Sequence, residues 1–97
     1  MLKYEKTSTE VMNQDSVYGN IEVHEYELFL GNESVGVMEM SMDKTHVYIF
    51  NVYLDEDYRG QKLFSTWLTS LGLTIICFQP VPEALAYWKI LADEIYP

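Results

Sequence analysis

Hydrophobic and polar residues alternate along the first half of the chain, which is the pattern of a sheet with one buried face. In "IEVHEYELFL" the apolar members are mostly two residues apart. Turn-forming pairs, Gly31-Asn32 and Asp43-Lys44, separate this stretch from two more of the same kind. We therefore predict an antiparallel meander of three strands, at residues 21–30, 34–42 and 45–54.

The second half of the chain has helical spacing interrupted by one apolar run. Gly72 follows the first set of helically spaced apolar residues and is a natural helix end. "LTIICF" is a short continuous apolar run, which is typical of a buried strand. "QPVP" then leads into a second amphipathic helix that we predict to reach the C-terminus. The apolar residues of the two predicted helices are Leu63, Trp67, Leu68 and Leu71, then Leu85, Trp88, Leu91 and Ile95.

These elements predict the α+β class, with the meander followed by a strand-helix-strand-helix order. A strand, helix and strand in succession imply a right-handed crossover and a parallel pair of strands. Residues 1–17 have no sustained period, so this segment is either a short strand over "LKYEKT" or a loosely held arm. At 97 residues the chain forms one domain, residues 1–97, because a second core would not fit.

The charge balance is strongly acidic, with 15 acidic against 6 basic residues and a net charge of −9. Direct nucleic-acid binding through clustered basic residues is therefore not expected. The acidic residues are scattered, which favours an ordinary acidic protein. The alternative is a surface that mimics DNA or attracts a basic partner.

Other chemistry and location are constrained by what the sequence contains. Cys77 is the single cysteine, so it forms no internal disulfide, and in an apolar strand it is an inert buried thiol. His24 and His46 lie in separate strands without metal-ligand spacing, so we predict no metal site. No apolar run approaches the roughly 20 residues of a membrane helix, and the N-terminus has no signal-peptide pattern. We predict a cytoplasmic protein that does not enter membranes.

Between the two halves lies "VYLDEDYRGQKLF", in which a strand ends in an Arg-Gly turn and leads into a helix. Amide groups at a helix start have no partner inside the helix, and the helix dipole adds positive potential there. Glycine lets a backbone approach phosphate oxygens closely. The stretch is therefore either a phosphate-binding turn or a plain strand-to-helix turn.

This stretch and the order of elements resemble the GCN5-related N-acetyltransferase (GNAT) family. The family's Val-x-Pro-x-Tyr-Arg-Gly-x-Gly-x-Gly-like segment aligns with Val52–Phe64 without a gap, and "EALAYWKIL" resembles its last helix. The resemblance covers about residues 21–96. It implies that backbone amides bind the pyrophosphate of acetyl-CoA or CoA. The implied cofactor-binding residues are Val52, Leu54, Arg59, Gly60, Gln61, Lys62, Leu63 and Phe64.

The chain departs from the family pattern inside this loop. Lys62 and Phe64 stand where the family has glycine. A cation at Lys62 would favour a pyrophosphate, whereas the large side chain of Phe64 would crowd the cofactor or fill the site. The stretch is thus a modified form of the family's loop.

The catalytic positions implied by the resemblance also differ. Trp88 aligns with the Tyr that commonly protonates the departing thiolate, and Val81 aligns with a common Asn. Tyr87 is the candidate acid that remains, although it lies about 100° away around the helix. Where the third strand commonly carries a base, this chain has Phe50 and Asn51. Catalysis by positioning alone remains open, and the departures favour weak or absent transfer.

Two functions therefore stay open at this stage. One is an acyl-CoA-dependent N-acetyltransferase that acts on an amine. The other is an inactive acidic binding module or DNA mimic on the same fold. The tail strands that usually follow the family's last helix are missing here, so "LTIICF" would be an open apolar edge. We therefore expect a homodimer or a protein partner to cover it.

Overall fold

The computed structural model describes residues 2–7, 12–60 and 62–96 of the chain. They form a mixed seven-stranded sheet in the order β1-β3-β4-β5-β6-β7, with β2 paired to β3. The strands are β1 (Leu2–Lys6), β2 (Met12–Ser16), β3 (Gly19–Leu30), β4 (Glu33–Met42), β5 (His46–Leu54), β6 (Thr74–Phe78) and β7 (Glu94–Tyr96). The helices are α1 (Leu63–Ser70) and α2 (Leu85–Leu91), with short 3-10 turns at Glu56–Tyr58 and Pro82–Ala84.

The centre of the sheet is formed by β3, β4 and β5, which are antiparallel neighbours in chain order. Gly31 makes the first turn possible, because its φ of +64° lies in the region that favours glycine. After β5 the chain crosses over through α1 and returns in β6, which pairs with β5 in parallel. Gly72, at φ +68°, ends the connection from α1, as its position in the sequence predicts. The α+β class predicted above is the class observed.

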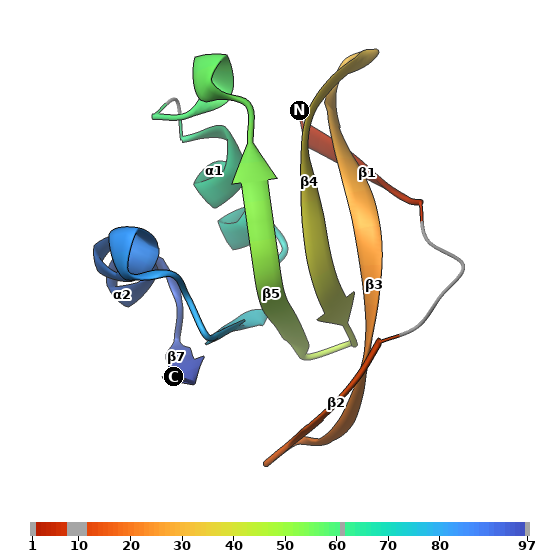
Figure 1. The fold of residues 1–97 in the computed structure, drawn as a ribbon, viewed down its shortest axis with the longest axis vertical. Helices are drawn as coiled ribbons and strands as arrows, with labels where there is room; N and C mark the ends of the chain where they lie inside the picture. Colours follow the sequence, from red (N-terminus) through yellow and green to blue (C-terminus); the bar gives the residue numbers. More distant parts are fainter. Residues whose placement is uncertain (1, 8–11, 61, 97) are drawn as a thin grey trace.

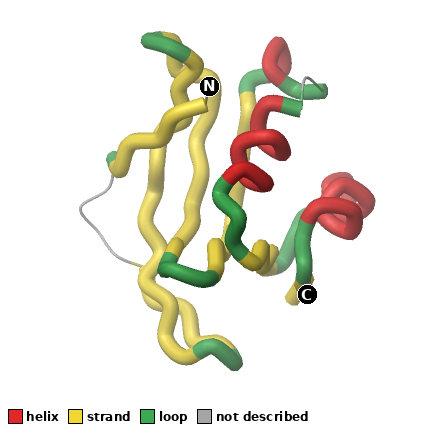
Figure 2. The backbone as a smooth tube through the Cα atoms, turned by 180° about the vertical axis from the view of Figure 1, so that it is seen from behind, coloured by secondary structure: helices red, strands yellow, loops and turns green. Residues whose placement is uncertain are grey.

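The helices lie on one side of the curved sheet (Figures 1 and 2). Their apolar residues join the larger of two hydrophobic cores, which we call the helix-side core. Leu68 of α1 and Leu28, Met38 and Met40 of the strands are at most 1% exposed there. This burial accounts for two of the three alternating methionines of β4 as packing residues.

The smaller core lies on the opposite face of the sheet and is largely aromatic. Strand β3 takes part in both cores because its residues alternate between the faces. Its first half buries Ile21 and Val23 in the smaller core, whereas its second half buries Leu28 in the helix-side core. The smaller core consists of Ile21, Val23, Tyr48, Ile76 and Phe78, with Tyr18, Phe50 and Tyr96 packed against it.

The prediction that the second helix reaches the C-terminus is wrong. α2 ends at Leu91, and Ala92 is already extended with φ −82° and ψ 144°. Asp93 then bonds to β6 twice, since its amide donates to the Ile75 carbonyl and its carboxylate accepts from the Ile75 amide at 2.7 Å. These bonds pull the chain into β7. Ile95 had the right spacing for the helix, but strand pairing determines its place.

The expectation of an open edge on β6 is corrected by the same segment. β7 pairs with β6 in parallel, from Ile76 opposite Glu94 to Phe78 opposite Tyr96. A homodimer or another partner is therefore not required to cover β6.

The N-terminal segment forms two strands where the sequence left a strand or an arm open. β1 pairs with the second half of β3 and β2 with its first half, both antiparallel. β1 buries Leu2 alone, which explains why its sequence has no apolar period. Within the ranges described above, none of the helices has the length and apolar character that crossing a membrane requires.

Candidate functional site

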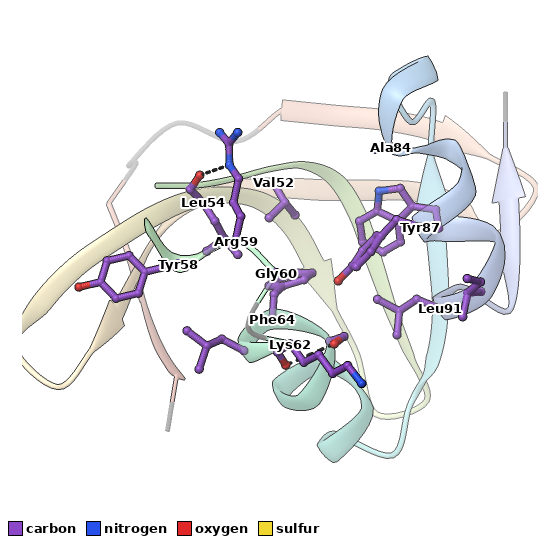
Figure 3. A pocket seen from close by; sticks show the side chains of 14 residues that line it. Val52, Leu54, Tyr58, Arg59, Gly60, Lys62, Phe64, Ala84, Tyr87 and Leu91 are labelled. Carbon is purple, nitrogen blue, oxygen red and sulfur yellow. Dashed lines mark hydrogen bonds between the residues drawn. The ribbon is translucent and has the colours of Figure 1, made fainter. Parts of the chain in front are cut away.

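An apolar pocket of about 720 Å³ lies between the end of β5, the start of α1 and one side of α2 (Figure 3). It collects seven of the eight residues predicted to bind a cofactor, together with Tyr87; the eighth, Gln61, lies outside the described residues. Its lining is Val52, Leu54, Tyr58, Arg59, Gly60, Lys62, Leu63, Phe64, Ser65, Ala84, Tyr87, Trp88, Ile90 and Leu91.

The pocket opens where β5 and β6 part. The two strands pair from His46 opposite Thr74 as far as Ile49 opposite Cys77, and β5 then continues to Leu54 without β6 beside it. Gln79, with φ of 49°, turns the chain away directly after β6. Along the described part of this edge, β5 therefore keeps backbone groups that no strand pairs, and Val52 lies in that stretch.

The turn after β5 leads directly into α1. The amide of Arg59 donates to the Glu56 carbonyl at 3.2 Å, so this amide is already used inside the turn. Gly60 has φ of +76°, which glycine adopts without strain. Lys62 precedes α1 with φ of 60°, and no side chain of the described residues caps the helix. The first amides of α1 have no hydrogen-bond acceptor within the helix, so they can donate to a bound anion.

The side chain of Arg59 is engaged with the strand. Its Nε donates to the Leu54 carbonyl at 2.7 Å, and its guanidinium carbon lies 4.9 Å from the centre of the Tyr53 ring. Figure 3 shows the guanidinium directed away from Gly60 and Tyr87. Arg59 thus fixes the turn to the end of β5, and its charge faces away from the pocket.

The two positions that depart from the family pattern have different roles. Phe64 is 4% exposed and belongs to the helix-side core, with its ring centre 5.5 Å from Trp67 and 6.2 Å from Trp88. It forms the floor of the pocket and joins the two helices. Lys62 holds a left-handed backbone conformation that costs a residue with a side chain about 1 kcal/mol. Its charged end extends in the opposite direction from that of Arg59 (Figure 3).

Tyr87 and Trp88 lie side by side on α2 but face different surroundings. Trp88 is 6% exposed and packs in the core, whereas Tyr87 is 43% exposed and lines the pocket. Burial raises the pKa of Tyr87 above its usual value, and a side-chain hydrogen bond with Ser65 opposes this effect. The Tyr87 hydroxyl points toward Gly60 and the start of α1 (Figure 3). At neutral pH this hydroxyl carries its proton and can donate it.

Several residues weighed in the sequence lie elsewhere. Phe50 stacks on Phe78 in the smaller core, with ring centres 4.5 Å apart, and the Asn51 amide donates to Glu39 at 3.3 Å. Val81 is exposed before the turn that leads to α2. Burial raises the pKa of the Cys77 thiol to about 11, so it stays protonated. None of these side chains lines the pocket.

Four pocket residues were not selected from the sequence: Ser65, Ala84, Ile90 and Leu91. Ser65 follows the loop by one residue and could have been found by extending it one turn into α1. Ala84 ends the 3-10 turn before α2, and Ile90 and Leu91 lie on α2, where helical spacing predicts a face but not the element that it packs against. Among the described residues, no group of three or more His, Cys, Asp or Glu side chains is placed to hold a metal ion.

No protein-family model matches the chain, and no curated protein sequence matches it either. Among solved structures, it is similar to an aminoglycoside acetyltransferase, meta-AAC0020, from an uncultured soil metagenomic sample, in complex with sisomicin. The identity is 14% over 76% of this chain and 45% of that one, with a TM-score of 0.37. The chain thus spans less than half of that protein, and the likeness is too low to define its fold. The fold and the pocket together define an α+β protein with a mixed sheet and an apolar pocket where β5 and β6 separate.

Proposed function

We propose that the chain is a GNAT-like protein that binds an acyl-CoA in this pocket and transfers the acyl group to an amine slowly. The observation that supports this proposal is the convergence of three parts. The loop after β5 that resembles the GNAT pyrophosphate-binding segment, the unpaired edge of β5 and the Tyr87 hydroxyl all border the same pocket. The sequence alone points to the loop, independently of the pocket.

The residues present fit the cofactor in three respects. The first amides of α1 and the Gly60 turn suit the pyrophosphate. The unpaired edge of β5 near Val52 suits an extended chain with amide groups, which can add to a sheet edge like a strand. The apolar walls suit the methylene groups between those amides. Since the Arg59 amide is used by Glu56, the binding amides are those that follow it.

Tyr87 holds the proton that the reaction needs. When bound, the acyl-CoA supplies a thioester whose acyl carbon an amine can attack, with the CoA thiolate leaving. Tyrosine is protonated at neutral pH, and burial raises the pKa of Tyr87 above its ordinary value, so its hydroxyl carries a proton that it can donate to that thiolate. Trp88, which occupies the aligned position, is buried and has no acidic proton to give.

The pocket also explains why transfer should be slow. Its described lining contains no carboxylate and no histidine, so no side chain there takes the proton from the amine. Water or the uncharged form of the amine must serve instead. A positioned base typically contributes about 10²–10⁴-fold, and this chain forgoes that factor. Binding without turnover is therefore the second function that this observation favours.

Calorimetry with acetyl-CoA tests the proposal, and desulfo-CoA serves as a non-reacting companion ligand. We expect both to bind with micromolar dissociation constants. Lys62→Glu places a carboxylate at the start of α1 and should weaken both ligands about tenfold. Lys89→Glu makes the same charge change at an exposed position of α2 that does not line the pocket and should leave affinity unchanged.

Tyr87→Phe separates binding from turnover. It removes the hydroxyl but keeps the ring, so acyl-CoA affinity should be retained while transfer to a panel of amines falls at least tenfold. Absence of heat at millimolar CoA would reject the pocket as a CoA site. Equal weakening by the two lysine variants would reject the loop as the phosphate-binding element. Binding with unchanged transfer in Tyr87→Phe would remove Tyr87 as the acid.

A further inference from the structure

The face of the sheet opposite the helices has an open part that carries glutamates from three strands. Residues two apart along a strand share a face. Glu25 and Glu27 of β3 therefore share the face of Ile21 and Val23, but they extend beyond the smaller core. Register places Glu5 opposite Glu27 and Glu39 opposite Glu25. We call these four glutamates the acidic face.

Few cations lie near the acidic face in the described part of the chain: Lys3 shares the face of Glu5 two residues along β1, and the Arg59 guanidinium lies over Tyr53 at the far end of the row. None of the four glutamates has a Lys or Arg nitrogen within ion-pair distance, and the recorded ion pair, His46 with Asp43, lies elsewhere. Their recorded side-chain partners are neutral: Thr7 donates to Glu25, Ser34 to Glu27 and Asn51 to Glu39. Like charges opposite one another on a sheet destabilise it by a few tenths of a kcal/mol each.

Two large apolar side chains border the acidic face and remain exposed. Val37 of β4 is 45% exposed and lies opposite Glu27, and Tyr53 of β5 is 53% exposed and lies opposite Val37. The row from Glu5 to Tyr53 thus runs across four strands from charge to apolar surface. Tyrosine and arginine are enriched at protein-binding surfaces, and here the Arg59 guanidinium lies over the exposed Tyr53 ring.

We propose that the acidic face is a docking surface for a basic segment of another protein, rich in Lys and Arg. Charge complementarity selects this occupant. A second copy of the chain would bring glutamates against glutamates, so this face does not form a homodimer. A nucleic acid would be repelled by the same charges. Tyr53 and Val37 supply the apolar contact that charge alone lacks, and the net charge of −9 steers a basic partner toward the molecule.

A defined peptide tests this surface without knowledge of the natural partner. The probe is a short synthetic peptide of alternating lysine and threonine, titrated into the labelled protein at low salt and followed by amide chemical shifts. We expect the largest shifts at Glu25, Glu27, Val37, Glu39 and Tyr53, with little change around the pocket. A glutamate-threonine peptide of equal length serves as the negative control.

Variants distinguish peptide binding at the acidic face from attraction by the overall negative charge. Replacing Glu25, Glu27 and Glu39 together by Gln should weaken the lysine peptide at least tenfold. The matched control replaces Glu22, Glu56 and Glu83 by Gln, which removes the same charge from exposed positions elsewhere and should change affinity less than twofold. Tyr53→Ala should weaken binding at high salt as well as at low salt, because its contribution is apolar.

The results that overturn the proposal are equally specific. Equal loss in the two triple variants would mean that the peptide senses net charge alone. Shifts spread over all surfaces, or centred on the pocket, would place the contact elsewhere. All these substitutions are at solvent-accessible positions, and an unchanged thermal unfolding curve would show that the variants fold.

Discussion

The two faces of the sheet are built from the same strands but differ in almost every other respect. On the helix side, Leu28, Val35, Met38 and Met40 are fully buried under α1 and α2, and the pocket opens in that layer. On the opposite face, the alternate residues of the same strands are glutamates, valine and tyrosine that reach solvent. The smaller core covers only the half of that face near β2 and β6.

The difference shows how one strand can serve two purposes. In β4, Val35 and Val37 are the same residue type two positions apart, yet the first is 0% and the second 45% exposed. A register shift separates pairs in both ladders of β4, between Leu28 and Phe29 on one side and Glu39 and Met40 on the other. Burial is therefore set by what covers each position, and the sequence pattern alone does not reveal it.

The largest effect on stability is expected at Gly36 of β4, which lies against the backbone of β5. A Cβ atom there would lie 2.1 Å from the Tyr53 carbonyl oxygen and 3.0 Å from the Leu54 Cα, so β4 and β5 would have to move apart. We expect Gly36→Ala to lower the free energy of unfolding by about 3 kcal/mol in urea denaturation. It should also weaken acyl-CoA binding, because Leu54 lines the pocket.

Gly31→Ala is the control for Gly36→Ala. Its Cβ would meet nothing within 4 Å, but its φ of +64° disfavours a side chain, so about 1 kcal/mol should be lost. If the two variants lose equal stability, the close approach of β4 and β5 is not what requires glycine at Gly36.

The next effect compares the two valines of β4 directly. Val35→Ala removes buried methyl groups and leaves a cavity, so it should cost about 2 kcal/mol. Val37→Ala, at a half-exposed position, should change stability by less than about 0.5 kcal/mol. Urea denaturation of both variants measures the difference. Similar losses would mean that the open face is covered in solution.

The central strands and the crossover could be predicted from sequence because their residues act locally. Alternation in β3 and β4, the turn at Gly31 and the helix end at Gly72 each depend on a few neighbouring residues. The loop that follows β5 was found for the same reason. Its neighbour in space, the Tyr87 side of α2, became visible only when the crossover placed the two together.

The rest depends on contacts that are distant in sequence. β1 buries one residue, so only pairing with β3 defines it. β7 exists because Asp93 bonds to Ile75, and no spacing rule shows such a bond. The smaller core joins Tyr18, Tyr48 and Tyr96, which lie in three separate segments and carry no common period. The role of Phe64 as a floor residue also required the position of Trp88.

A smaller, opposite effect is expected at the loop on the helix side. Lys62→Gly relieves the left-handed backbone at φ 60°, so the free energy of unfolding should rise by about 1 kcal/mol. Glycine also loses more entropy on folding, which reduces the gain. Urea denaturation measures the change, and calorimetry shows whether the lost cation outweighs it in CoA binding. A loss of stability would mean that the Lys62 side chain makes a contact that offsets the strain.

The smallest effect is expected on the acidic face, where the glutamates repel one another at the surface. Glu25→Gln keeps an oxygen that can accept from Thr7 and removes one charge opposite Glu39, so stability should rise by about 0.4 kcal/mol at low salt. The gain should fade as salt screens the pair. Glu22→Gln, on the same strand but opposite Asn13, is the control and should gain less. If both variants gain equally, the repulsion comes from net charge, and the acidic face carries no local strain that a basic partner could relieve.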